Sequence, residues 1–150
     1  MTALLLNKPD TIIWDLDGHY TKTEMINHLQ IIQKEVWPPN PDPLVGLTTY
    51  IRHANDVSFG NRHDKADVVI LLTTGNTADH SGFWLASMSK GYILDKLHGL
   101  SNNVIVFGIG HRVQRSNLRE IATDDEHLFL LNNVYELPSY AERAKRHICV

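Results

Sequence analysis

The chain has 150 residues, of which 43% are hydrophobic and 21% charged, and its formal net charge is −3. These values are ordinary for one globular domain that buries a real core, so residues 1–150 are treated as a single domain. The small net charge argues against nucleic acid or an anionic membrane as partner, and no apolar stretch is long enough to span a membrane.

The first informative stretch is "TIIWDLDGHYTKTE", residues 11–24. Its apolar start predicts a short buried strand that ends in a polar turn containing Asp15 and Asp17. Thr21 and Glu24 have the T-x-x-E spacing of a capping box, which predicts that a helix begins at residue 22. This helix is expected to run to residue 37, where "PPNPDP" stops it.

The rest of the chain alternates between strand and helix patterns. Strands are predicted at residues 44–51, 66–75, 103–110 and 127–131, with residues 56–60 as a short hairpin partner of the first. The stretch "ADVVILLTTG" (66–75) is apolar throughout, which predicts a central parallel strand. Helices are predicted at 82–98, at 117–123 and at the C-terminus, with Pro138 near the first turn of the last one.

This alternation predicts an α/β fold, with a doubly wound, mostly parallel sheet flanked by helices. Function in such sheets lies at the carboxyl ends of the strands. Asp17, Thr74 and Gly110 are therefore expected along one rim.

One interpretation is enzymatic. The segment "WDLDGHYT" is similar to the first motif of haloacid dehalogenase-like phosphatases, which implies a nucleophilic Asp15 and an Asp17 that handles the leaving-group proton. The acidic pair at residues 124–125 is expected at the opposite rim, however. The basic residue that such an enzyme needs could only be Lys90 or Lys96, which lie in a helix expected to face solvent.

A second resemblance covers residues 10–149. The segments "TIIWDLDGHYTKTEMINHLQIIQKEV", "VGLTTYIRHANDVSF", "VVILLTTGNTADH" and "NVIVFGIGHRVQRSNLREIATDDEHLFLLNNVYEL" resemble, in order, a von Willebrand factor type A domain, the fold of the inserted domain of integrins. Only "NRHDK" separates the predicted hairpin from the central strand, so this version of the domain is shortened there. One face of the sheet is then less covered.

The resemblance implies a site for a divalent cation at the sheet rim, built from a D-x-S-x-S motif, a distant threonine and a later aspartate. Asp17 matches the first aspartate and Thr21 the second serine, whereas His19 replaces the first serine and Thr74 the later aspartate. The distant threonine has no counterpart. Because Mg²⁺ requires a near-octahedral set of oxygen ligands, the site is expected to bind it weakly or not at all.

An alternative is a changed ion. Asp17 and His19, with His80 or Asp79, would offer nitrogen and oxygen ligands that suit Zn²⁺ better than Mg²⁺. The cofactor is therefore predicted to be none, or a divalent cation such as Mg²⁺, Ca²⁺ or Zn²⁺.

The resemblance implies a non-enzymatic extracellular binding or adhesion module that recognises a protein or matrix partner through the rim. The binding residues are expected to be Asp17, His19, Thr21, Thr74 and Asp79.

The segment "MTALLLNKPD" is too short and too poor in positive charge for a signal peptide, so the leader of a secreted protein is expected outside this sequence. The less covered sheet predicts a homo-oligomer or a partner subunit. Cys149 is expected to be unpaired or to join another chain.

Overall fold

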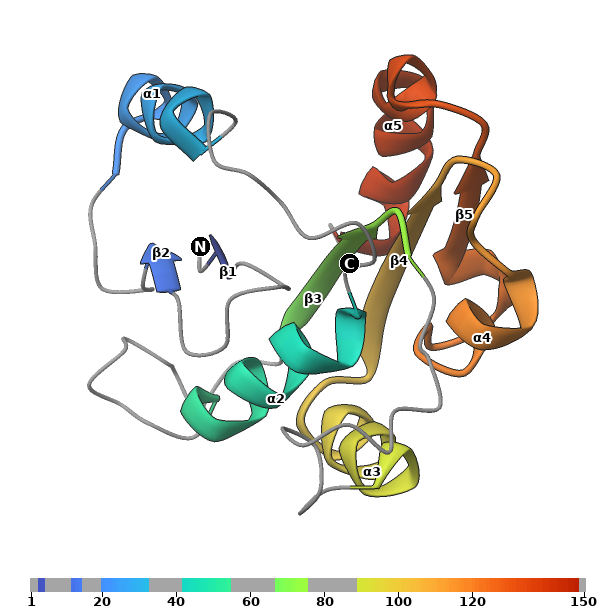
Figure 1. The fold of residues 1–150 in the computed structure, drawn as a ribbon. Helices are drawn as coiled ribbons and strands as arrows, with labels where there is room; N and C mark the ends of the chain where they lie inside the picture. Colours follow the sequence, from blue (N-terminus) through green and yellow to red (C-terminus); the bar gives the residue numbers. More distant parts are fainter. Residues whose placement is uncertain are drawn as a thin grey trace.

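The structure is a computed structural model in which residues 3–4, 12–14, 20–32, 42–54, 67–75 and 89–148 are described. Two strands and two helices come first, and from β3 onward strands and helices alternate along the chain (Figure 1). In order they are β1 (Ala3–Leu4), β2 (Ile12–Trp14), α1 (Lys22–Ile32), α2 (Pro43–His53), β3 (Val68–Thr73), α3 (Lys90–Leu100), β4 (Asn103–Ile109), α4 (Arg115–Arg119), the 3₁₀ turn η2 (Asp125–His127), β5 (Leu128–Leu131), the 3₁₀ turn η3 (Val134–Glu136) and α5 (Leu137–Ile148).

The main sheet confirms the predicted α/β fold. Its three strands are parallel and lie in the order β3-β4-β5, with Leu71 opposite Val106 and Val106 opposite Leu128. β4 is the strand buried on both faces, as residues 104–107 are at most 4% exposed. The prediction that residues 66–75 contain a parallel strand is confirmed, but in the described part of the chain the central position belongs to β4. Within the described residues β3 is an edge strand, because only its β4 side carries a partner.

Helices cover the two faces of the sheet unequally. On one face Val104, Val106 and Leu128 pack with apolar side chains of α2, α3 and α4. On the other face Ile105, Phe107 and Phe129 pack against α5, where the small Ala144 lets the helix approach closely. Burying each large apolar side chain contributes about 1.5–3 kcal/mol, so these two layers supply most of the driving force for folding.

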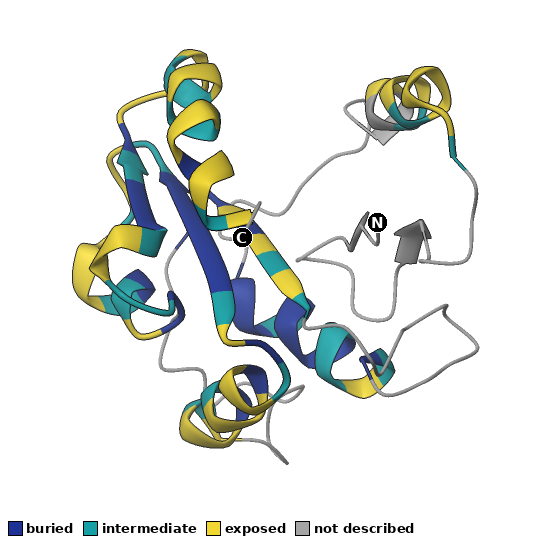
Figure 2. Cartoon of the chain, turned by 180° about the vertical axis from the view of Figure 1, so that it is seen from behind, coloured by how far each residue is buried: buried dark blue, intermediate teal, exposed yellow. Residues whose placement is uncertain are grey.

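α5 packs on β4 and β5 and leaves β3 uncovered on the same face of the sheet. The β3 side chains Val68, Ile70 and Leu72 lie on the same face as Ile105 and Phe107, since Ile70 is opposite Ile105 and Leu72 is opposite Phe107. They are nevertheless 40–48% exposed, and Figure 2 shows the resulting alternation of colour along the strand. This agrees with the expectation that one face of the sheet is less covered.

The strand predicted at residues 11–14 exists as β2, but it does not join the three-stranded sheet in the described part of the chain. It pairs antiparallel with β1, with Ala3 opposite Trp14. An antiparallel partner needs only a short connection, which the few residues between β1 and β2 provide. In the described part of the chain β2 thus lies outside the parallel sheet whose strands end near Thr74 and Gly110, whereas Asp17 itself lies outside the described residues.

A helix, α2, replaces the strand predicted at residues 44–51. The side chain of Asp42 accepts a hydrogen bond from the Leu44 N–H at 2.9 Å. Pro43 stands in the first helical turn, where its missing N–H leaves no hydrogen bond broken. Leu44 and Leu47 are both buried, at the spacing of one helix face. The cap and this burial outweigh the strand preference of the valine and threonine residues.

Other predictions differ mainly in their limits. The strands predicted at 103–110 and 127–131 are confirmed as β4 and β5, and Pro138 lies in the first turn of α5. The helix predicted at 117–123 is the shorter α4. The predicted hairpin partner at 56–60 lies outside the described residues. Among the described helices none is long and apolar enough to cross a membrane.

Candidate functional site

Two of the three residues expected along one rim lie at the carboxyl ends of parallel strands. Thr74 follows β3 and Gly110 follows β4, and the register pairs Thr73 with Gly108 just before them. Thr73 is buried, and its hydroxyl accepts a hydrogen bond from the Gly75 N–H at 3.1 Å, which fixes the turn. Thr74 is exposed.

Thr21 lies at the start of α1 in the predicted capping box, which is confirmed. The Thr21 N–H and hydroxyl donate to the Glu24 carboxylate at 2.7 and 2.8 Å, and the Glu24 N–H donates back to the hydroxyl at 3.3 Å. The hydrogen bond from the Thr21 N–H, followed by that from its hydroxyl, lowers the pKa of Glu24. This keeps a negative charge at the helix N-terminus, where the helix dipole favours it.

The capping box also changes the expected ligand set. The Thr21 hydroxyl, predicted as a metal ligand, donates a hydrogen bond to the Glu24 carboxylate and accepts one from the Glu24 N–H. One lone pair of its oxygen therefore remains for a cation. Sequence reasoning used Glu24 only as a capping residue. The structure places its carboxylate beside a predicted ligand, where it offers a hard oxygen that the family motif does not assign.

The other predicted site residues lie outside the described residues. These are Asp17, His19 and Asp79, together with the alternatives Asp15 and His80, and their roles stay predictions. Within the part of the chain that the structure describes, Thr21 and Thr74 share no hydrogen bond, and no group of three potential metal-binding side chains occurs.

The acidic pair considered for a phosphatase has structural contacts instead. Asp124 caps η2 and Asp125 begins it, and η2 leads into β5, which confirms that both lie at the amino end of this strand. A hydrogen bond from the His127 side chain at 2.7 Å is the main cause that lowers the pKa of Asp124. Asp125 forms an ion pair with Arg115 at 2.8 Å. Neither carboxylate is near the end of the sheet where the chemistry would occur.

The two lysines considered for that enzyme are also engaged elsewhere. Lys90 forms an ion pair with Glu120 at 2.8 Å, and the Lys96 ammonium lies 5.6 Å from the centre of the Tyr92 ring. Neither contact involves Thr74. The described residues therefore give the phosphatase interpretation no support.

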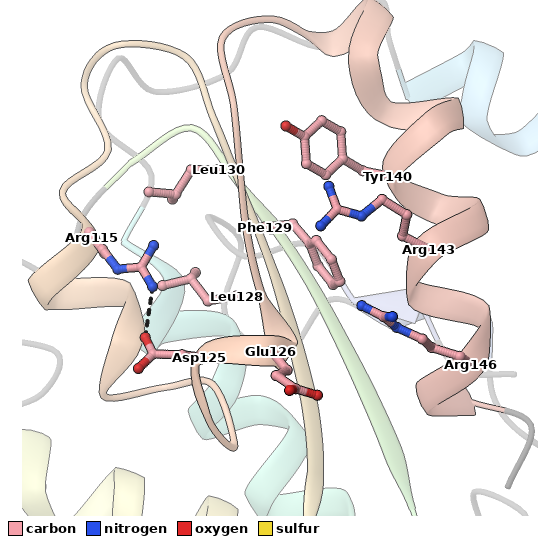
Figure 3. A pocket seen from close by; sticks show the side chains of 9 residues that line it. All are labelled: Arg115, Asp125, Glu126, Leu128, Phe129, Leu130, Tyr140, Arg143 and Arg146. Carbon is pink, nitrogen blue, oxygen red and sulfur yellow. Dashed lines mark hydrogen bonds and ion pairs between the residues drawn. The ribbon is translucent and has the colours of Figure 1, made fainter.

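Sequence reasoning missed a groove at the opposite edge of the sheet. It has a volume of about 420 Å³ and lies between α5 and the segment from α4 to η2 (Figure 3). Arg143 and Arg146 line it from α5. Their i, i+3 spacing, which places both on one helix face, is the sequence signal that could have indicated it.

Comparisons with known proteins agree with this architecture. The family model of the von Willebrand factor type A domain matches residues 6–143. No match was found among curated protein sequences.

Three solved structures of proximal thread matrix protein 1 from the mussel byssus are similar to the chain. Their TM-scores are 0.74, 0.75 and 0.77, at 19–20% sequence identity. Each alignment covers 99% of this chain and 36% of the mussel chain, so this chain spans about a third of that protein's length. One of the three is described as having a zinc-occupied MIDAS motif.

Proposed function

The chain belongs to the von Willebrand factor type A family, and we propose that it acts outside the cell as a non-enzymatic binding module. Domains of this family are in general binding modules rather than enzymes. The mussel protein with the same fold is a matrix protein of the byssus, which supports an extracellular protein or matrix component as partner. The observation that carries the proposal is the family match over residues 6–143.

The proposed contact surface is the rim at the carboxyl ends of the strands. Its described member at a strand end is the exposed Thr74, and Thr21 at the start of α1 is assigned to it in this proposal. Asp17, His19 and Asp79 complete the surface in this proposal. Ligands of open parallel sheets bind at this end of the strands, which supports the choice of surface.

A capture experiment tests the rim. The wild-type chain and a Thr74→Arg variant are immobilised and exposed to the extracellular fluid of the source tissue. A partner retained by the wild type and lost by the variant supports the rim, because a large cation at position 74 obstructs contact there. A Glu142→Gln variant on α5, far along the chain from the rim residues, serves as control. Equal capture by all three chains contradicts the proposed surface.

The donor set does not fit Mg²⁺ well. Asp17 is its one carboxylate from the family motif, His19 brings a nitrogen, and the hydroxyl of Thr21, which donates to Glu24, has one lone pair left for a cation. Mg²⁺ requires near-octahedral oxygen ligation, so we infer that the site binds this ion weakly or has lost it. Zn²⁺ accepts nitrogen together with oxygen ligands, and the zinc-occupied motif of the mussel protein supports it as the alternative ion.

Calorimetric titration separates these possibilities. We expect no binding of Mg²⁺ or Ca²⁺ at concentrations below about 1 mM, where a complete oxygen site would saturate. If Zn²⁺ binds, His19→Ala and Asp17→Asn should each weaken it by about tenfold or more, because each removes one ligand. Zinc binding that survives both substitutions would place the ion elsewhere on the chain. Tight Mg²⁺ binding would contradict the inferred loss of oxygen ligands.

A further inference from the structure

The floor of the groove is the free edge of β5. In Figure 3 the side chains of Leu128 and Leu130 lie on one side of the strand and that of Phe129 on the other, toward α5. Because successive residues of a strand point to opposite faces, one groove can touch all three only if it follows the strand edge. In the described part of the chain β5 pairs with β4 alone. The hydrogen bond from the Gly110 N–H to the Leu131 C=O shows that Leu131 faces β4, so the outward N–H and C=O groups are those of Leu128 and Leu130. No described strand pairs with them, which leaves this edge as a candidate for a further strand.

The α5 wall of this groove carries two arginines that form no ion pair with a described carboxylate. The Arg143 guanidinium lies 5.8 Å from the centre of the Phe129 ring and 5.1 Å from that of Tyr140. Arg146 donates through Nε to His147 Nε2 at 3.2 Å. Among the described residues neither arginine forms an ion pair. A guanidinium stacked on rings still has its N–H edge available for a carboxylate.

The opposite wall is nearly balanced in charge. Arg115 pairs with Asp125 at 2.8 Å, and Arg119 shares the same carboxylate at 3.2 Å. Glu126 lines the groove as well. Three arginines and two carboxylates leave the lining with a net charge of +1, concentrated on α5.

We propose that this groove binds an extended acidic peptide as an additional strand on the edge of β5. The peptide backbone pairs with the open N–H and C=O groups, and every second side chain points toward α5. Acidic residues at these positions meet Arg143 and Arg146, which are separated by about 4.5 Å along the helix axis. Alternate side chains of a strand repeat at about 6.6 Å, a difference that the long arginine side chains accommodate.

The charge also argues against a second copy of the chain at this edge. Antiparallel pairing of two β5 strands would bring the basic α5 walls of both copies to the same interface. Like charges brought together in this way cost free energy, whereas an acidic strand is attracted. The partner is therefore a segment with acidic residues at alternate positions. This surface lies at the lateral edge of the sheet and is distinct from the rim proposed above.

Fluorescence polarisation tests the proposal with a short labelled peptide that alternates glutamate with valine. We expect saturable binding that weakens with added salt, since exposed ion pairs are screened. Substituting glutamine for glutamate in the peptide, or Arg143→Gln with Arg146→Gln in the protein, should weaken binding by about tenfold or more. The matched control is Lys145→Gln, which removes a positive charge from the same helix outside the groove and should change binding less than about twofold.

Two further measurements keep the test decisive. A peptide methylated on the alternate backbone nitrogens that face β5 should bind poorly. Hydrogen exchange should slow at Leu128 and Leu130, whose amides face away from β4, when the unmodified peptide binds. Arg146→Gln alone removes a charge from the groove and leaves the contacts of Arg143 with the Phe129 and Tyr140 rings in place. Equal binding of the glutamate and glutamine peptides overturns the proposal. The proposal also fails if the Arg143→Gln, Arg146→Gln double variant binds the peptide as the wild type does but forms dimers through the β5 edge. The arginines would then serve only to prevent two copies of the chain from pairing their β5 strands.

Discussion

Glycine residues near the end of β4 serve packing and turning. A Cβ on Gly108 would lie 2.5 Å from the Leu118 side chain and 3.0 Å from that of Leu130. Its absence lets α4 pack directly on the sheet. Gly110 has a φ of +91°, a conformation that glycine adopts without strain. These two needs explain why glycine occupies positions 108 and 110.

The surroundings of His147 lower the pKa of its ring and so favour its neutral form. Burial is the largest cause that lowers the pKa of its ring, followed by the nearby His127, whose ring centre is 4.2 Å away, and by Arg146. Glu126 and Asp124 act in the opposite direction. The hydrogen bond from Arg146 Nε to His147 Nε2 also requires a nitrogen without a proton.

The free energy of unfolding should therefore fall as the pH drops below the ordinary histidine pKa of 6.5. In that range the unfolded chain binds a proton at this residue that the folded chain resists, so acid favours unfolding until the folded pKa is passed. The lowered pKa of Asp124 adds a second loss below the ordinary aspartate value of 3.8. Urea denaturation of wild type and His147→Gln between pH 8 and pH 5 measures the first effect.

The variant should show a shallower pH dependence than the wild type. At pH 8 the histidine ring of the wild type and the amide of the variant are both uncharged. A difference in the free energy of unfolding at that pH therefore reports packing alone, and it is subtracted from the differences at lower pH. An unchanged slope would assign the acid sensitivity to other groups.

The site residues were only partly predictable from the sequence. The T-x-x-E spacing identified the capping box, and the end of an apolar run placed Thr74 at the sheet rim. Sequence spacing carries no information on contacts between distant segments, so it could not show that Arg143 and Phe129 share a groove.

At the scale of elements, the limits of strands that are continuous apolar runs were predicted well. β4 and β5 are apolar runs between turns, and both were found within one or two residues of their expected limits. α2 was missed because valine and threonine residues were read as strand formers, although "PDP" before them also fits a helix start. Local propensity is weak beside a side-chain cap and the burial of Leu44 and Leu47.

The cap of α2 gives a test of this assignment. Asp42→Ala removes the acceptor of the Leu44 N–H and should lower the free energy of unfolding by about 1 kcal/mol, within a usual range of about 0.5–2. Asp42→Ser, which keeps a capping oxygen, should lose less. Chemical denaturation followed by circular dichroism measures both. Equal losses would mean that no helix N-terminus at this position depends on the side chain.

At the scale of the whole molecule, the unequal cover of the sheet is the feature with the widest consequence. α5 shields β4 and β5, while Val68, Ile70 and Leu72 on β3 stay 40–48% exposed (Figure 2). Adjacent exposed apolar side chains on an edge strand favour association with another apolar surface. The expected self-association of the chain has its structural support here, at the edge opposite to the basic groove.

Light scattering coupled to size-exclusion chromatography tests this expectation. The wild-type chain should show a concentration-dependent increase in mass, and Ile70→Lys should shift it toward the monomer, because a charge buried in an apolar interface is strongly unfavourable. Ile26→Lys is the matched control, since Ile26 on α1 is 44% exposed and Ile70 48%. It makes the same chemical change away from the exposed Val68, Ile70 and Leu72 side chains of β3 and should leave the mass unchanged. A wild-type monomer at high concentration, or equal effects of the two variants, would contradict association through β3.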